Sequence, residues 1–183
     1  MVIRNWRRIC SVKGTANLFV MIRTFLLVAG ISVTIAAPSR GQTRLSFGTG
    51  LGRAGTTESS LSEGKNGTIY MGQIVRSVLP FIGIGAEANR WSTGSLNTTF
   101  VTGILQVAVP LTGFRLKAGA GYGTGDPDGL GKVSGTAVQL GASYDFTIPA
   151  APIAITLFSN ALLAHSAARS VQMVNAGLAL TLR

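Results

Sequence analysis

The stretch from Phe114 to Gly123 alternates strictly between two kinds of residue, and this alternation constrains the fold more than any other feature. Every second position from Phe114 is apolar, and the positions between are basic residues or glycine. Neighbouring side chains of a β-strand point to opposite faces, so a period of two predicts a strand with different surroundings on its two sides. The apolar face comprises Phe114, Leu116, Ala118, Ala120 and Tyr122, and the other face comprises Arg115, Lys117, Gly119, Gly121 and Gly123.

Aromatic residues stand at both ends of this apolar face. At about 3.3 Å per residue and a tilt of roughly 40°, the distance from Phe114 to Tyr122 corresponds to a height of about 20 Å. A transmembrane β-barrel carries an apolar outer band of similar height, with aromatic rings at both lipid interfaces. The opposing glycines suit the narrow interior of a small closed barrel. A soluble barrel would alternate as well, with its apolar face turned inward.

A second strand of the same kind follows a loop rich in Gly, Asp and Pro, residues 123–135. Between Thr136 and Ile148 the even positions are apolar and the odd positions are small or polar. The two segments therefore predict an antiparallel hairpin. The even set is Val138, Leu140, Ala142, Tyr144, Phe146 and Ile148.

The first 41 residues have the three parts of a secretory signal peptide: a basic start, the apolar run 24–37, and small residues before Gln42. We expect cleavage after Gly41, with cleavage after Ala37 as the alternative. Met21 begins a shorter segment that would itself form a complete signal, so translation from Met21 is also open. The other interpretation is an uncleaved membrane anchor over residues 18–37.

The net charge of +10 belongs mostly to this predicted signal peptide. The six Asp and Glu residues all follow residue 42, which leaves a net charge of +4 on residues 42–183 and no indication of nucleic-acid binding. Cys10 is the only cysteine, so the mature chain has no disulfide scaffold. The basic residues before position 42 are Arg4, Arg7, Arg8, Lys13, Arg23 and Arg40.

Residues 42–183 are expected to form one domain of eight strands. The connections alternate in length: three short turns contain proline, and the others are longer and polar, above all residues 54–67 and 123–135. This rhythm is typical of transmembrane barrels, which have short periplasmic turns and longer surface loops. The sequence predicts an all-β, eight-stranded, antiparallel, up-and-down transmembrane barrel. The expected strands are 44–53, 68–79, 81–91, 98–109, 114–123, 136–148, 153–164 and 171–183. The expected short turns lie at 80, 110–113 and 149–152. Loops of intermediate length are expected at 92–97 and 165–169.

The segment 68–79 is apolar on both faces, so alternation alone does not fix its orientation. We assign its odd positions to the lipid side, which keeps Arg76 inside the barrel. The odd set is Ile69, Met71, Val75 and Leu79, and the competing even set is Tyr70, Ile74 and Val78.

Across residues 43–183 the chain resembles the small eight-stranded outer-membrane proteins of the OmpA, OmpX and OmpW type, in architecture, signal peptide and strand-loop rhythm. The resemblance implies a monomer in the outer membrane of a Gram-negative bacterium, in contact with membrane lipid and with the barrel-assembly machinery. Such barrels end on an aromatic residue, whereas this chain ends Leu182-Arg183. We expect Leu182 to take the place of that residue.

Five charged residues are predicted to face the barrel lumen. An eight-stranded barrel is just filled by its own side chains, so we expect these charges to form a network that plugs the interior. The alternative is a narrow, porin-like ion path gated by the same pairs. The five residues are Arg44, Glu87, Arg115, Lys117 and Asp145.

Other residue combinations indicate neither catalysis nor a cofactor. Outer-membrane lipid A deacylases resemble this architecture and use His, Ser and an acidic residue, but His165 and Ser166 are adjacent and would point to opposite faces. The segment from Asp126 to Gly129 offers few oxygen ligands for Ca²⁺ and is expected to form a turn. We therefore expect no enzyme, metal or cofactor.

The function expected from the sequence is a structural or surface-interaction role, exerted through the loops 54–67 and 123–135. A soluble periplasmic lipocalin-like carrier is the alternative from a different class. In that protein the apolar faces would line a cavity for a hydrophobic ligand.

Overall fold

The computed structural model describes residues 42–56, 64–127, 129, 131–148, 151–166 and 169–183. The predicted signal peptide, residues 1–41, lies outside these residues, so the signal and its cleavage site remain predictions. Among the residues described, none belongs to a helix of the length and apolarity needed to cross a membrane.

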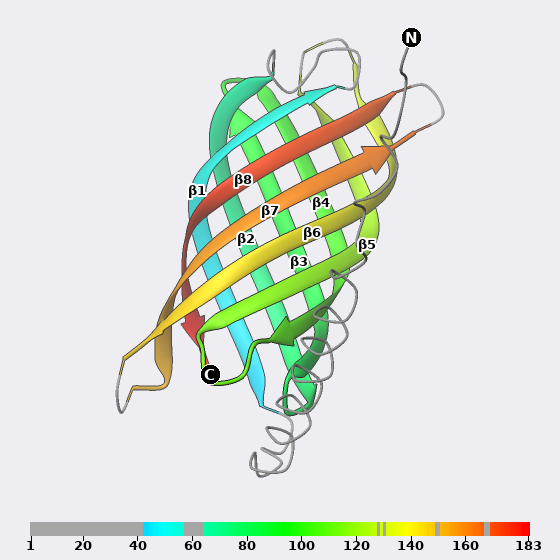
Figure 1. Ribbon diagram of the computed structural model, residues 1–183. Coiled ribbons are helices and arrows are strands. Elements are labelled where there is room, and N and C mark those ends of the chain that lie inside the picture. The colour runs from blue at the N-terminus through cyan, green and yellow to red at the C-terminus, as the bar shows by residue number, and fades with distance from the viewer. Residues whose placement is uncertain (1–41, 57–63, 128, 130, 149–150, 167–168) are drawn as a thin grey trace, which may run out of the picture. The chain divides into compact units, whose positions relative to one another are not determined.

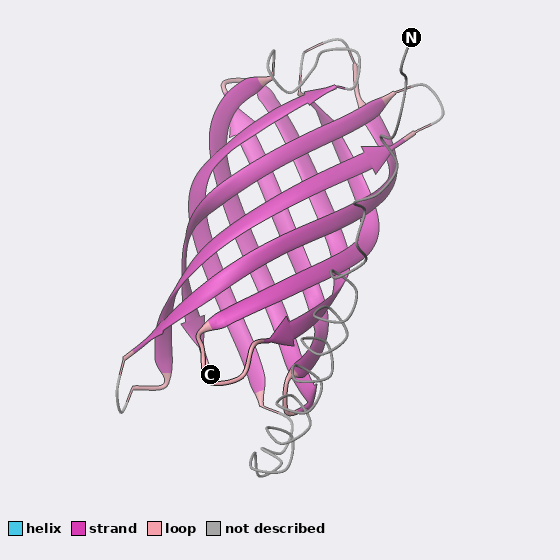
Figure 2. Cartoon of the chain, in the orientation of Figure 1, coloured by secondary structure: helices cyan, strands magenta, loops and turns pink. Residues whose placement is uncertain are grey.

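Eight antiparallel strands form one closed barrel, in which each strand pairs with the next and β8 pairs with β1 (Figures 1 and 2). The closing ladder runs from Leu45 opposite Leu182 to Thr56 opposite Val171. Closure leaves no strand edge, so every ladder finds hydrogen-bond partners within the sheet. The strands are β1 (Thr43–Thr56), β2 (Lys65–Leu79), β3 (Ile82–Thr93), β4 (Leu96–Ala108), β5 (Phe114–Asp126), β6 (Val133–Thr147), β7 (Ile153–His165) and β8 (Ser170–Leu182).

The three proline-containing turns lie at the same end of the barrel, together with the start of β1 and the end of β8. Pro80 lies in the turn between β2 and β3. In the turn between β4 and β5, Leu111 adopts a φ of 61°, and the amide of Val109 donates to the carbonyl of Phe114 across the turn. We call this the turn end and the opposite end the loop end.

At the loop end the strands extend further than predicted, and the loops are correspondingly shorter. Residues 54–56 and 65–67 belong to β1 and β2, and β5 continues to Asp126. The expected loop 92–97 is a two-residue turn, Gly94-Ser95, in which the φ of +56° at Gly94 suits a tight hairpin. These extensions are polar and glycine-rich. Backbone pairing continues through them without the apolar alternation that marks a strand in sequence.

The predicted inner and outer faces are confirmed for seven strands and wrong for β2. Ile69, Met71 and Val75 are almost fully buried inside, whereas Tyr70 and Ile74 are exposed on the outer surface. The sequence could not decide this orientation because β2 is apolar on both faces and packs against an apolar part of the lumen. Arg76 is consequently exposed rather than internal, and Leu79 is exposed beyond a register shift between Ser77 and Leu79.

Candidate lumen charge network

The interior of the barrel contains an apolar cluster that the sequence analysis did not identify. Trp91 and Phe100 are fully buried and come from neighbouring strands near the loop end. Trp91 lies two residues from the inward residue Asn89, and Phe100 lies two residues from the inward residue Thr98. The alternation of side chains along a strand therefore predicts that both rings face inward. The cluster comprises Ala54, Ile69, Met71, Trp91, Phe100, Val133, Ala137, Phe158, Leu162, Ala164, Val171, Met173 and Ala179.

Glu87 on β3 is the centre of the first polar group in the lumen. Its carboxylate forms a salt bridge with the ammonium of Lys117 on β5, and both side chains are almost completely buried. Four side-chain amides also donate to the carboxylate: Gln73, Asn89, Gln139 and Asn160, at 2.6–3.1 Å. One carboxylate and one ammonium balance in charge, and both carboxylate oxygens have several donors. The buried charge of Glu87 is therefore well compensated.

Asp145 on β6 is the centre of the second polar group, nearer the turn end. Its Oδ2 atom accepts hydrogen bonds from three guanidinium groups: Arg44 at 2.6 Å, Arg115 at 3.0 Å and Arg183 at 3.1 Å. The other oxygen, Oδ1, accepts from the hydroxyl of Thr156 at 2.7 Å. The side chains of Arg115 and Arg183 keep 22% and 24% of their surface exposed, whereas that of Arg44 keeps 7%.

The structure places all five predicted lumen residues inside the barrel and divides them between these two groups. Glu87 and Lys117 form one pair, and Arg44 and Arg115 converge on Asp145. Arg183 is a third partner of Asp145 that was not among the predicted lumen residues. Its position could have been deduced, because Arg183 lies in phase with the inward residue Thr181.

His165 forms a hydrogen bond with a serine other than the one considered from sequence. Its Nδ1 atom lies 2.7 Å from Oγ of Ser170, its partner in the β7–β8 register. Among the described residues no carboxylate is hydrogen-bonded to His165. An activated nucleophile would need such an orienting acid on its base.

The segment beginning at Asp126 forms a turn, as expected. Oδ1 of Asp126 accepts a hydrogen bond from the amide of Gly129 at 2.7 Å, and Gly129 has a φ of +82°. Asp128 lies outside the described residues. Within the described part of the chain, no group of three or more His, Cys, Asp or Glu side chains could hold a metal ion.

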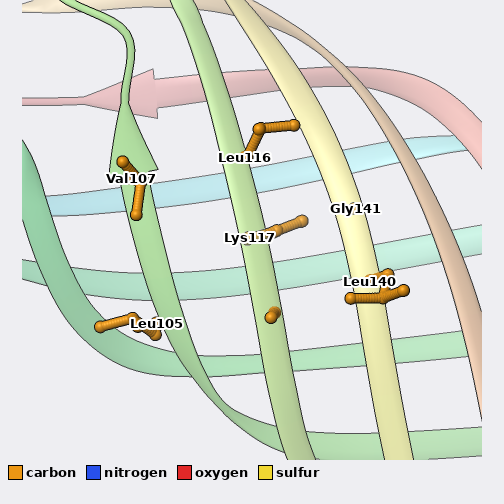
Figure 3. A pocket seen from close by; sticks show the side chains of 7 residues that line it. Leu105, Val107, Leu116, Lys117, Leu140 and Gly141 are labelled. Carbon is orange, nitrogen blue, oxygen red and sulfur yellow. The ribbon is translucent and has the colours of Figure 1, made fainter. Parts of the chain in front are cut away.

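A shallow apolar hollow lies on the outer wall over β4, β5 and β6 (Figure 3). Leucine and valine side chains from the three strands surround the small residue Ala118. Lys117 and Gly141, which are register partners, also line the hollow, and the ammonium of Lys117 pairs with Glu87 in the lumen. The surrounding side chains are Leu105, Val107, Leu116 and Leu140.

The closed sheet, its apolar exterior and its polar interior define the class of the fold: a small eight-stranded β-barrel of the outer-membrane type. No protein-family model and no curated protein sequence matches the chain.

Solved structures agree with this class. The attachment invasion locus protein Ail of Yersinia pestis is similar with a TM-score of 0.51 and 15% identity, over 78% of this chain and 99% of Ail. Ail in complex with the heparin analogue sucrose octasulfate gives a TM-score of 0.51 and 16% identity, with the same coverage. Neisserial surface protein A is similar with a TM-score of 0.54 and 8% identity, over 76% of this chain and 96% of that protein. At these identities the likeness shows the fold, and it confirms the predicted resemblance to small outer-membrane barrels.

Proposed function

We propose that this protein is a monomeric, non-enzymatic barrel of the Gram-negative outer membrane that acts at the cell surface through its loops. The proposal rests on the distribution of apolar and charged side chains between the two faces of the barrel wall. Large apolar side chains such as Leu51 and Leu140 are exposed on the outside at 77% and 66%, while the charged residues Glu87, Lys117 and Asp145 are buried within. A wall of this kind is stable where its outside contacts lipid.

The lipocalin-like alternative requires the opposite arrangement. Its apolar strand faces would have to line an internal cavity, but Leu105, Leu116 and Leu178 lie on the exterior with about half of their surface exposed. A soluble carrier with this exterior would present an apolar band of large area to water. The alternative is therefore wrong for this chain.

The packed lumen favours a sealed barrel over a narrow ion path. Trp91, Phe100 and Phe158 are fully buried in the interior, and the pair Glu87–Lys117 joins β3 to β5 across it. An ion would have to displace these three aromatic side chains and a desolvated ion pair to pass. We expect no single-channel conductance when the protein is inserted into a planar lipid bilayer.

Two observations support a proposed role in surface attachment: the loop end and the names of the similar folds. One similar barrel is named for attachment and invasion, another is a surface protein, and Ail has been crystallised with a heparin analogue. In this chain, Lys65 and Lys132 are exposed beside the two longest loop-end connections. We therefore propose that the loops bind a surface partner, with a sulfated glycan as the first ligand to examine.

The experiment compares bacteria that produce the full chain with bacteria that produce a loop variant. Residues 57–63 are replaced by Gly and Ser in the variant, which leaves the described ends of β1 and β2 intact. Adhesion to heparin-coated and to matrix-coated surfaces should fall to the level of non-producing cells in the loop variant, while barrel content in the outer membrane stays unchanged. A variant with Ser in place of Thr112, in a turn-end connection, is the control. Equal adhesion of all producing and non-producing strains would contradict the attachment role.

A further inference from the structure

The two polar groups of the lumen differ in how well their charges are balanced. In the group around Glu87 one carboxylate faces one ammonium, and the remaining donors are neutral amides. In the group around Asp145 one carboxylate faces three guanidinium groups. Counting side chains alone, the Asp145 group carries an excess of two positive charges.

This excess is confined to a small volume inside the barrel. All three arginines place a nitrogen within 3.1 Å of the same oxygen of Asp145. Arginine remains protonated in proteins, so the excess cannot be relieved by loss of a proton. Mutual repulsion between the guanidinium groups is strong where water is largely excluded. A second anion at this position would relieve that repulsion.

Unused donors are present beside the excess charge. The Nε atoms of Arg44 and Arg183 are buried, and among the described residues neither has a hydrogen-bond acceptor. The side chain of Arg44 is 93% buried, so its unpaired Nε is not compensated by bulk water. Buried donors of this kind are normally satisfied by a protein group, by water or by a ligand.

We infer that the cluster of Arg44, Arg115 and Arg183 is a binding site for a phosphate group at the turn end of the barrel. The planar guanidinium group presents paired N–H donors whose spacing matches two oxygens of a phosphate, and it binds phosphate more specifically than a lysine does. Arg115 and Arg183, each partly exposed, form the accessible side of the site. Asp145 anchors the three side chains, so the site is preorganised before the anion arrives.

Inorganic phosphate and the headgroup phosphate of a lipid could both supply this chemistry. At the turn end, Arg76 lies on the outer surface of β2 and is also basic, which makes it a matched control outside the cluster. The site itself does not depend on the proposed role of the loops, which lie at the other end of the barrel.

The test uses the full chain in uncharged detergent micelles. Inorganic phosphate is titrated by calorimetry, and the unfolding temperature is measured in phosphate and in sodium chloride of matched ionic strength. A parallel series replaces free phosphate with micelles that contain phosphatidylglycerol. Saturable binding and a phosphate-specific rise in unfolding temperature are expected in one series or in both, and the series that responds identifies the source of the phosphate group.

Substitutions distinguish this site from general attraction to a basic protein. Arg115→Gln or Arg183→Gln should weaken phosphate binding by about tenfold or more, since each removes charge-assisted hydrogen bonds, whereas Arg76→Gln should leave it unchanged. In the absence of phosphate, Arg183→Gln should not lower the unfolding temperature, because it also removes repulsion. The inference is overturned if phosphate, phosphatidylglycerol and chloride act alike on the unsubstituted chain, or if Arg76→Gln weakens binding as much as Arg183→Gln does.

Discussion

Glu87 and Lys117 show how a charge can be retained inside a barrel of this size. Both side chains are buried, and removing one partner would leave the other as an unpaired charge in a medium of low dielectric constant. Among the described residues, Glu87 also organises the amides of Gln139 and Asn160 into one network. The pair therefore contributes more to the stability of the barrel when both members are present than either member does alone.

Glu87→Gln should lower the free energy of unfolding by about 3–5 kcal/mol, because Lys117 loses its only charged partner in the described network. Urea unfolding in detergent or lipid vesicles, followed by tryptophan fluorescence, measures the change. The double variant Glu87→Gln/Lys117→Met should recover most of the loss. If the double variant is as unstable as the sum of the two single variants, the buried pair does not have this role.

The inner wall also contains glycines whose missing side chain is required by packing. A Cβ atom at Gly123 would lie 2.6 Å from the Cβ of Ala164 and 2.9 Å from the ring of Phe100. At Gly103, which is exposed on the outer face, the nearest atom would be 3.7 Å away.

Gly123→Ala should therefore destabilise the barrel by about 1–3 kcal/mol, since the added methyl group overpacks the lumen. Gly103→Ala, the matched control, should leave stability nearly unchanged. The comparison is made by urea unfolding under identical lipid conditions. Equal stability of the two variants would contradict the inward position of Gly123.

The strand β2 has an orientation opposite to the one that its sequence favoured, and labelled side chains can test it. Ile74 lies on the outer surface and Met71 lies inside, although the sequence pattern favoured the reverse. Cysteine variants can report this difference in a background in which Cys10, the only natural cysteine, is replaced by Ser.

A fluorophore attached at Ile74→Cys should be strongly quenched by nitroxide-labelled lipid, because the side chain contacts the acyl chains. The same fluorophore at Met71→Cys should be quenched weakly, and Leu105→Cys on the outer face of β4 provides the reference for full lipid contact. Strong quenching at Met71→Cys together with weak quenching at Ile74→Cys would restore the orientation expected from the sequence.

The other strands were predictable because their two faces differ in polarity. In β3, Glu87 and Asn89 face inward while Ile84 and Ala86 face outward, so parity alone fixed the assignment. The same rule identified the lumen charges. The rule failed for β2 because both of its faces are apolar. It also did not reveal which charged side chains meet. The contact between Glu87 on β3 and Lys117 on β5 depends on the stagger of the strands around the barrel. The three arginines around Asp145 therefore required the three-dimensional structure.

The interior of the barrel changes in polarity and charge along its length. The charge-balanced group around Glu87 lies nearer the loop end than the positively charged group around Asp145. The apolar cluster extends from the loop end to Phe158, which lies between Thr156 and Asn160 on β7. Outside, large apolar side chains cover all eight strands. This arrangement suits the outer wall to membrane contact, and it agrees with the proposed closure of the lumen and the proposed binding of a partner at the loop end.

The lipid-facing exterior of the closed barrel is tested by gel mobility of the full chain folded in detergent micelles, with unboiled and boiled samples compared. A closed barrel resists the gel detergent, so the unboiled sample should migrate differently from the boiled one, and the folded form should require detergent to stay in solution. A folded monomer that is soluble in plain buffer and shows no shift on boiling would contradict an exterior that faces lipid.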